Sequence, residues 1–160
     1  MKVNSVTLSK IKIMKKHIII AVDLSESTSA ILNEAFDFAS HMNAKITLVS
    51  IISMYVDYLH SDMSLLPTQW EDIYNSQKEF AMTELNKIKD AHKELEIDIH
   101  TAVGNPKFDV IDFANEAKAD YIVMGTHGRT GLSHLVIGST AEYIIRHATI
   151  PVLIIPQKTK

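Results

Sequence analysis

The chain has 160 residues, of which 46% are hydrophobic and 22% charged, and its formal net charge at pH 7 is −3. The length suits one domain with a sizeable core. The lack of a basic excess argues against general binding to nucleic acids or membrane surfaces. The absence of cysteine excludes disulfides, thiolate metal sites and cysteine nucleophiles.

The N-terminal segment differs from the rest in composition. Five lysines fall within the first 16 residues, and no acidic residue precedes Asp23. Residues 1–14 are predicted to form a basic, disordered leader, and residues 15–158 a single domain. A translation start at Met14 and a basic tail that contacts an anionic partner are the alternatives. No apolar run reaches the roughly 18 residues of a membrane span, and none resembles a signal peptide, so a cytoplasmic location is expected.

The first predicted strand, residues 16–22 (KHIIIAV), is a continuous β-branched run, as expected of a strand buried on both faces. A cluster of turn and N-cap formers that begins at Asp23 ends it. Apolar residues then recur at helical spacing up to Met42, which predicts an amphipathic helix. Residues 45–52 form a second apolar run and predict another buried strand.

The middle of the chain is predicted to hold a loop, a long helix and a strand. Residues 53–67 have no clear period and are predicted as loop. An apolar stripe at helical spacing predicts a helix from residue 68 to about residue 94. Residues 96–103 alternate between apolar and polar, which predicts a strand near a sheet edge, less enclosed than the first two.

Residues 104–106 (GNP) are turn formers that end the strand, and a helix is predicted from there to about residue 118. Residues 120–125 predict a fourth strand, residues 138–147 a last helix, and residues 151–156 a fifth strand. The regular alternation of strands and helices predicts an α/β fold, with a five-stranded parallel sheet, right-handed crossovers and helices on both faces.

Four of the five glycines lie within residues 125–138 (GTHGRTGLSHLVIG). Glycine lets backbone approach a ligand closely, and exposed N–H groups in such loops form anion sites. The Gly-Ser-Thr sequence at 138–140 opens a helix, whose N-terminus suits phosphate. Ligands of open parallel sheets bind outside the carboxyl ends of the strands, so this segment is expected to meet Asp23. The alternative is that the glycines merely shape a tight surface loop.

The spacing Gly125-x2-Gly128-x9-Gly138-Ser139 resembles the nucleotide-binding signature of the universal stress protein family. The similarity extends over residues 15–156 through four further pieces: Ala21-Val22-Asp23-x-Ser25, Leu48-Val49-Ser50-Ile51, Gly104-Asn105-Pro106 and Pro151-Val152-Leu153-Ile154-Ile155-Pro156. The resemblance implies an open, Rossmann-like sheet of strand order 3-2-1-4-5, a homodimer, and the ATP binding of one branch of the family.

The resemblance also implies which residues bind the nucleotide. Asp23 and the backbone near Ala21 and Ile51 would contact the adenosine, while the glycine-rich loop and the start of the last helix would wrap the phosphates. The expected binding residues are Ala21, Asp23, Ile51, Met124, Gly125, Thr126, His127, Gly128, Arg129, Gly131, Gly138, Ser139, Thr140 and Ala141. Two positions depart from the family pattern: Ser50 stands where many members carry histidine, and Ala141 lacks the hydroxyl of some ATP-binding members.

Three of these side chains have more than one interpretation. Asp23 suits a ribose hydroxyl or a helix N-cap, but Ser25 and Ser27 compete for the same cap, which favours the ligand role. His127 is interpreted as a positioning or exposed residue rather than a catalytic base. Arg129 either pairs with a terminal phosphate or is exposed on the loop.

Catalytic motifs are missing from the sequence. It has no Gly-x4-Gly-Lys-[Ser/Thr] loop of a P-loop hydrolase and no carboxylate pair near the glycines for two-metal chemistry. It also has neither Ser-Gly-Gly-x-Asp-Ser nor His-x-Gly-His, the motifs that an adenylating enzyme would need. The resemblance implies a stress-response sensor or regulator that binds ATP, with ADP or AMP as the other possible ligands, and the missing motifs predict little or no catalysis. The alternatives are a nucleotide-free dimeric interaction module of the same fold and a weak ATP hydrolase. The histidines lack metal-ligand spacing, so any Mg²⁺ would be carried by the phosphates.

The last predicted strand, from Pro151 to Pro156, is apolar on both faces. At a sheet edge its open hydrogen-bonding groups would be a liability unless they are covered. Pairing with the same strand of a second copy covers them with two-fold symmetry. The sequence therefore predicts a homodimer through this strand, and it leaves any further protein partner unknown.

Overall fold

The computed structural model describes residues 15–53, 67–126 and 137–156, so the predicted leader and most of the predicted loop at 53–67 lie outside the described residues. The strands are β1 (His17–Ala21), β2 (Lys45–Ser53), β3 (Ile97–Gly104), β4 (Tyr121–Gly125) and β5 (Val152–Ile155). The helices are α1 (Thr28–His41), α3 (Pro67–Ala91), α4 (Pro106–Glu116) and α5 (Ser139–His147). Strands and helices alternate as the sequence predicts.

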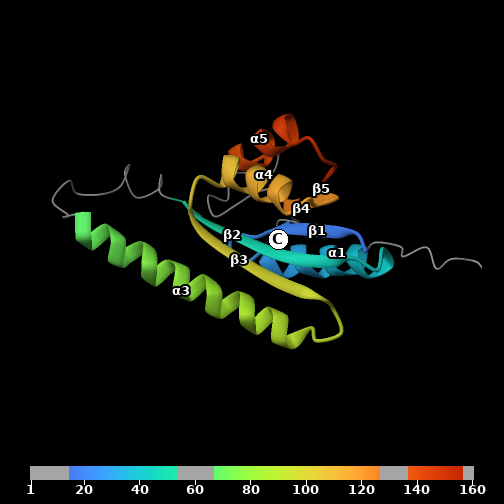
Figure 1. Ribbon diagram of the computed structural model, residues 1–160, viewed down its shortest axis with the longest axis horizontal. Coiled ribbons are helices and arrows are strands. Elements are labelled where there is room, and N and C mark those ends of the chain that lie inside the picture. The colour runs from blue at the N-terminus through green and yellow to red at the C-terminus, as the bar shows by residue number, and fades with distance from the viewer. Residues whose placement is uncertain (1–14, 54–66, 127–136, 157–160) are drawn as a thin grey trace, which may run out of the picture.

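The five strands form one parallel sheet of order β3-β2-β1-β4-β5, which confirms the predicted topology. Helices α1 and α3 cover one face, and α4 and α5 cover the other (Figure 1). Since all the strands are parallel, their carboxyl ends lie along the same edge of the sheet. The turn that follows β1 therefore begins at the same edge as the carboxyl ends of β2 and β4.

Strand β1 supplies both hydrophobic cores, as its unbroken apolar sequence predicts. Ile18 and Ile20 pack in the core beneath α1 and α3, whereas Ile19 packs in the core beneath α4 and α5. All three side chains are fully buried, at 0% exposure. A strand at the centre of a doubly covered sheet has no face left for polar residues.

Strand β3 is a sheet edge, and this confirms the weaker enclosure that its alternating pattern predicts. Of its eight residues, Ile97 is buried, Asp98 is exposed and the other six are half-buried. The opposite edge is β5, also half-buried except for Ile155. The two edges differ in composition, because β5 is apolar throughout while β3 carries polar side chains.

Helices α1 and α4 stop slightly before the predicted residues 42 and 118, since each is followed by a left-handed residue. Asn43 has φ 48° and Lys118 has φ 51°. In both cases the next N–H bonds to a carbonyl of the last turn, from Ala44 to Ala39 and from Ala119 to Ala114, at 3.0 and 2.9 Å. This is the Schellman arrangement, which satisfies the last carbonyls of a helix.

The break at Gly104-Asn105-Pro106 starts α4. Asn105 is the N-cap and accepts a hydrogen bond from the Lys107 N–H at 3.0 Å, while Asp109 accepts one from the Asn105 N–H at 2.8 Å. A Cβ at Gly104 would overlap the Asp109 carboxylate, so a side chain there would have to displace the group that accepts the Asn105 N–H. Within the described ranges, no helix combines the length and apolar character that crossing a membrane requires.

Candidate functional site

The candidate site lies at the carboxyl ends of β1, β2 and β4. Ala21 is in register with Val49 on one side and with Met124 on the other. The Val22 N–H extends the ladder by one bond to the Val49 carbonyl, at 2.9 Å. Two of the predicted contact residues, Ala21 and Met124, therefore lie side by side, and Ile51 lies two residues farther along β2 from Val49.

Asp23 lies in the turn that follows β1. Its Oδ1 accepts a hydrogen bond from the Ser25 N–H at 3.1 Å, which makes an Asx turn. The N-cap of α1 is Ser27, whose hydroxyl makes no capping bond and instead lies 2.8 Å from the Ser25 hydroxyl. The interpretation of Asp23 as the helix N-cap is therefore wrong, and its carboxylate belongs to the turn at the sheet edge.

The end of β4 and the start of α5 are joined directly. The Gly138 N–H donates to the Thr126 carbonyl at 2.8 Å, and the Thr126 N–H donates to the Ile155 carbonyl at 3.2 Å. The N-terminus of α5 therefore lies next to the carboxyl end of β4, although Gly138 is 12 positions after Thr126 in the sequence. His127, Gly128, Arg129 and Gly131 of the predicted site lie outside the described residues.

The first turn of α5 offers backbone donors. The Glu142 N–H makes the first intrahelical bond, to the Gly138 carbonyl at 2.9 Å, so the preceding N–H groups of Ser139, Thr140 and Ala141 have no partner within the helix. Gly138 is the N-cap and, lacking a side chain, makes no capping bond. Such a terminus attracts anions through its N–H groups and its partial positive charge.

The side chains of this turn differ in accessibility. Ser139 is exposed and Thr140 is half-buried. Ala141 is 2% exposed and packs in the core beneath α4 and α5. The Ala141 side chain, which lacks the hydroxyl of some family members, therefore faces the core. This residue can contact a ligand only through its backbone N–H.

Two residues at the same edge were not singled out from the sequence. Leu24 has φ 57°, which is uncommon for a residue other than glycine and is a kind of strain that gathers at functional sites. Thr28, the first residue of α1, is 7% exposed, and its hydroxyl has no hydrogen-bond partner within the described part of the chain. Neither residue could be recognised from the sequence. A leucine gives no sign that its backbone is strained, and Thr28 is one of several neighbouring residues with a hydroxyl group.

Comparison with known proteins identifies the family. Residues 14–156 match the model of the universal stress protein family. A universal stress protein of Methanocaldococcus jannaschii is 33% identical over 149 residues, which cover 91% of this chain and 84% of that protein. Universal stress protein A homolog 1 of Coxiella burnetii is 33% identical over 144 residues, 89% of this chain and 97% of that one.

Solved structures share the fold. The hypothetical protein MJ0577 superposes with a TM-score of 0.79 at 23% identity, over 92% of this chain and all of that one. A universal stress protein in complex with cAMP gives a TM-score of 0.59 at 22% identity, over 89% and 97% of the chains. One from Archaeoglobus fulgidus in complex with dAMP gives 0.57 at 25% identity, over 87% and 96%. On its sequence and its fold, this chain belongs to the universal stress protein family.

Proposed function

We propose that this protein binds an adenine nucleotide at the carboxyl edge of the sheet, between the Asp23 turn and the first turn of α5. The observation that carries the proposal is the 2.8 Å bond from the Gly138 N–H to the Thr126 carbonyl, which sets a helix N-terminus beside the end of β4. Phosphates suit that terminus, and a ribose hydroxyl suits the Asp23 carboxylate. The related proteins solved with cAMP and dAMP support the adenine class of ligand.

We propose ATP as the ligand, with ADP or AMP as competitors at the same site. A backbone cradle recognises charge and shape, and Mg²⁺ would be carried by the phosphates. The sequence supplies no catalytic motif, which favours a cytoplasmic stress-response sensor or regulator over an ATP hydrolase.

The test of nucleotide binding uses the full chain. Freshly purified protein is denatured and the supernatant is analysed for released adenine nucleotide, and the nucleotide-free protein is then titrated with ATP by calorimetry. Replacing Asp23 by Asn is expected to weaken binding by about 10-fold or more, because a hydrogen bond to a charged group is lost. The matched control is Asp112→Asn, an exposed aspartate on α4, which should bind ATP as the wild type does.

If the purified protein neither releases an adenine nucleotide nor binds added ATP, the nucleotide proposal is wrong. The nucleotide-free interaction module then becomes the better description of the chain. Equal effects of the Asp23 and Asp112 substitutions would place the ligand away from the Asp23 turn.

We further propose a homodimer through β5. This strand is a sheet edge, and a groove of about 540 Å³ runs beside it, lined by Phe38 of α1 and Leu153 and Ile154 of β5 among others. Antiparallel pairing of two β5 strands would complete both edges. Light scattering at micromolar concentration is expected to give twice the monomer mass of 17.9 kDa, and a monomeric mass would contradict the proposal.

A further inference from the structure

The second edge of the sheet, β3, has backbone groups that face away from its neighbour. The Ile46 N–H donates to the Glu96 carbonyl at 2.9 Å, and this fixes the phase of the β2–β3 ladder. In a parallel ladder, alternate residues of a strand bond to the same neighbour. The N–H and C=O groups of Ile97, Ile99, Thr101 and Val103 therefore point away from β2.

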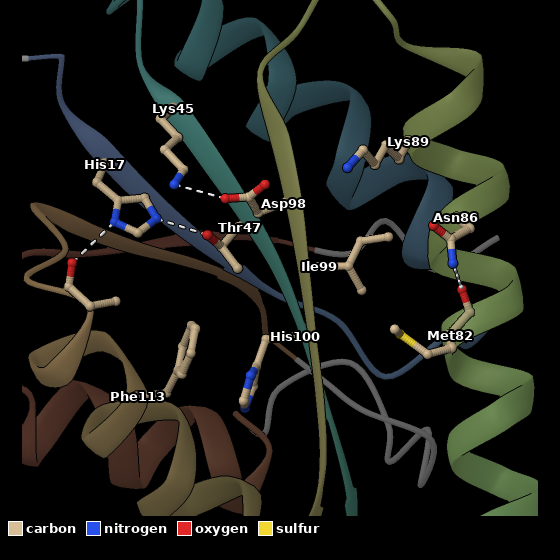
Figure 2. Close-up of a pocket in the computed structure, with 11 residues that line it drawn as sticks. His17, Lys45, Thr47, Met82, Asn86, Lys89, Asp98, Ile99, His100 and Phe113 are labelled. Atoms are coloured by element: carbon tan, nitrogen blue, oxygen red, sulfur yellow. Dashed lines mark hydrogen bonds and ion pairs between the residues drawn. The ribbon is translucent and has the colours of Figure 1, made fainter.

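A groove of about 650 Å³ runs beside this edge. Figure 2 shows Met82, Asn86 and Lys89 on α3 on one side of it, with Ile99 of β3 pointing toward them. Met82 is 41% exposed, which is high for a large apolar side chain on a helix that packs against a sheet.

The face of the groove nearer α4 holds two stacked rings. His100 and Phe113 lie parallel, with ring centroids 3.9 Å apart. The groove also reaches His17 and Lys45, which begin β1 and β2. It therefore lies toward the amino ends of the strands, at the opposite end of the sheet from the candidate nucleotide site.

Two lysines, Lys45 and Lys89, and one aspartate, Asp98, line the groove. Lys45 forms an ion pair with Asp98 at 2.7 Å, and this bond holds the pKa of Asp98 below its usual range, so that carboxylate is neutralised by its partner. Lys89 lies close enough to Asp98 to act on it, and Lys78 acts on His100 in the same way.

His100 itself adds no positive charge at neutral pH. Burial, and then the nearby Lys78, lower the pKa of His100, while Glu116 acts in the opposite direction. With Asp98 already paired to Lys45, Lys89 lines the α3 side of the groove as a cation. Lys78, also on α3, lies outside the lining residues but close enough to act on His100.

We propose that this groove binds an acidic, extended segment of a partner protein, which joins the sheet as a sixth strand beside β3. The backbone groups of Ile99 and Thr101 would pair with the added strand, as in other cases of strand addition. Side chains of that strand would alternate between the lysines of α3 and the His100–Phe113 stack.

The spacing of the lysines limits the partner sequence. Lys78 and Lys89 are 11 residues apart on α3, which corresponds to ~16 Å along a helix. A strand advances ~3.3 Å per residue, so the same distance corresponds to about five residues of the added strand. Side chains on one face recur every second residue, and the partner is therefore expected to carry acidic residues about four to six positions apart.

The test uses a fluorescein-labelled octapeptide of alternating Glu and Val, titrated with the full-length protein and followed by fluorescence anisotropy. We expect saturable binding, at least about tenfold weaker for a Lys-Val peptide of the same pattern. The double variant Lys78→Glu/Lys89→Glu should also lose about tenfold or more in affinity, because two attractive contacts become repulsive. The matched control is Lys87→Glu, a lysine on α3 that pairs with Glu84 and is not among the lysines that act on Asp98 or His100.

A second variant tests the strand edge independently of charge. The Thr101 N–H points away from β2, so Thr101→Pro removes an outward donor without removing a ladder bond. It should abolish binding of the Glu-Val peptide, whereas Thr101→Val keeps the N–H and should bind as the wild type does. Far-ultraviolet circular dichroism and ATP titration check that both variants remain folded, and ATP binding is expected to be unchanged.

Three outcomes would overturn the proposal. The first is no binding of the Glu-Val peptide at 1 mM protein. The second is binding that survives both the lysine double variant and Thr101→Pro. The third is a doubled mass that only Thr101→Pro removes, since a second copy of this chain would then occupy the edge. None of these outcomes bears on nucleotide binding at the far end of the sheet.

Discussion

Replacing Gly138 by Asp is expected to weaken ATP binding by about 100-fold while leaving the protein as stable as the wild type. Gly138 has φ −60° and ψ 148°, a conformation open to any residue, and it is the N-cap of α5. Aspartate is among the best N-cap residues, so the helix should tolerate it. A carboxylate about 4 Å from a phosphate, however, costs roughly 1 to 4 kcal/mol near a protein surface, which spans about 5-fold to 1,000-fold in affinity.

The matched control is Gly138→Asn, which has the same shape and capping ability but no charge. It should bind ATP within about threefold of the wild type, and both variants should keep the wild-type melting temperature or exceed it. Calorimetric titration with ATP and thermal unfolding measure the two effects. Equal losses in the Asp and Asn variants would mean that side-chain bulk matters rather than charge. Wild-type affinity in the Asp variant would remove the α5 terminus from the phosphate site.

The fold could be predicted from the sequence because its buried strands carry a strong signal. The run of isoleucines at 18–20 marks a strand enclosed by helices, and all three side chains are fully buried. The alternation in residues 96–103 marks an edge strand, as the sheet order confirms. These patterns report burial, which depends on the hydrophobicity of each residue and needs no knowledge of distant contacts.

The site could be predicted only in outline. The glycine spacing predicts the segment, and the alternation of elements predicts the sheet edge at which the proposed site lies. The bond between Gly138 and Thr126 joins residues that are 12 positions apart in the sequence, and no local pattern contains it. The left-handed conformation of Leu24 also leaves no signal in the sequence, because it is a property of the backbone rather than of the side chain.

The groove beside β3 could not be predicted from the sequence either. It depends on how far α4 and α3 extend over the sheet edge, which is set by packing between elements. His100 illustrates this, since the sequence shows it as one of eight scattered histidines. Only the folded chain shows that its ring lies parallel to Phe113 and borders the groove.

Two neighbouring residues of β1 are expected to give the largest losses of stability. Ile19→Ala and Ile20→Ala should each lower the free energy of unfolding by about 2–5 kcal/mol, because each leaves a cavity in a close-packed core. Ile19 and Ile20 lie in different cores, on opposite faces of the sheet. Their effects should therefore be nearly additive. Since a domain has only about 5–15 kcal/mol in total, the double variant is expected to be largely unfolded at 25 °C.

Urea unfolding followed by circular dichroism measures these losses, with Ile145→Ala as the control. Ile145 lies on α5 and is 44% exposed, so its truncation should change the free energy of unfolding by only about 0.5 kcal/mol. The comparison of the two β1 variants tests the architecture itself. If helices covered only one face of the sheet, one of the two substitutions would cause only a small loss in the free energy of unfolding. A cost below about 1 kcal/mol at either position would show that its core is loosely packed. Similar, large losses at both positions would mean that the two helical layers contribute comparably to holding β1 at the centre of the sheet.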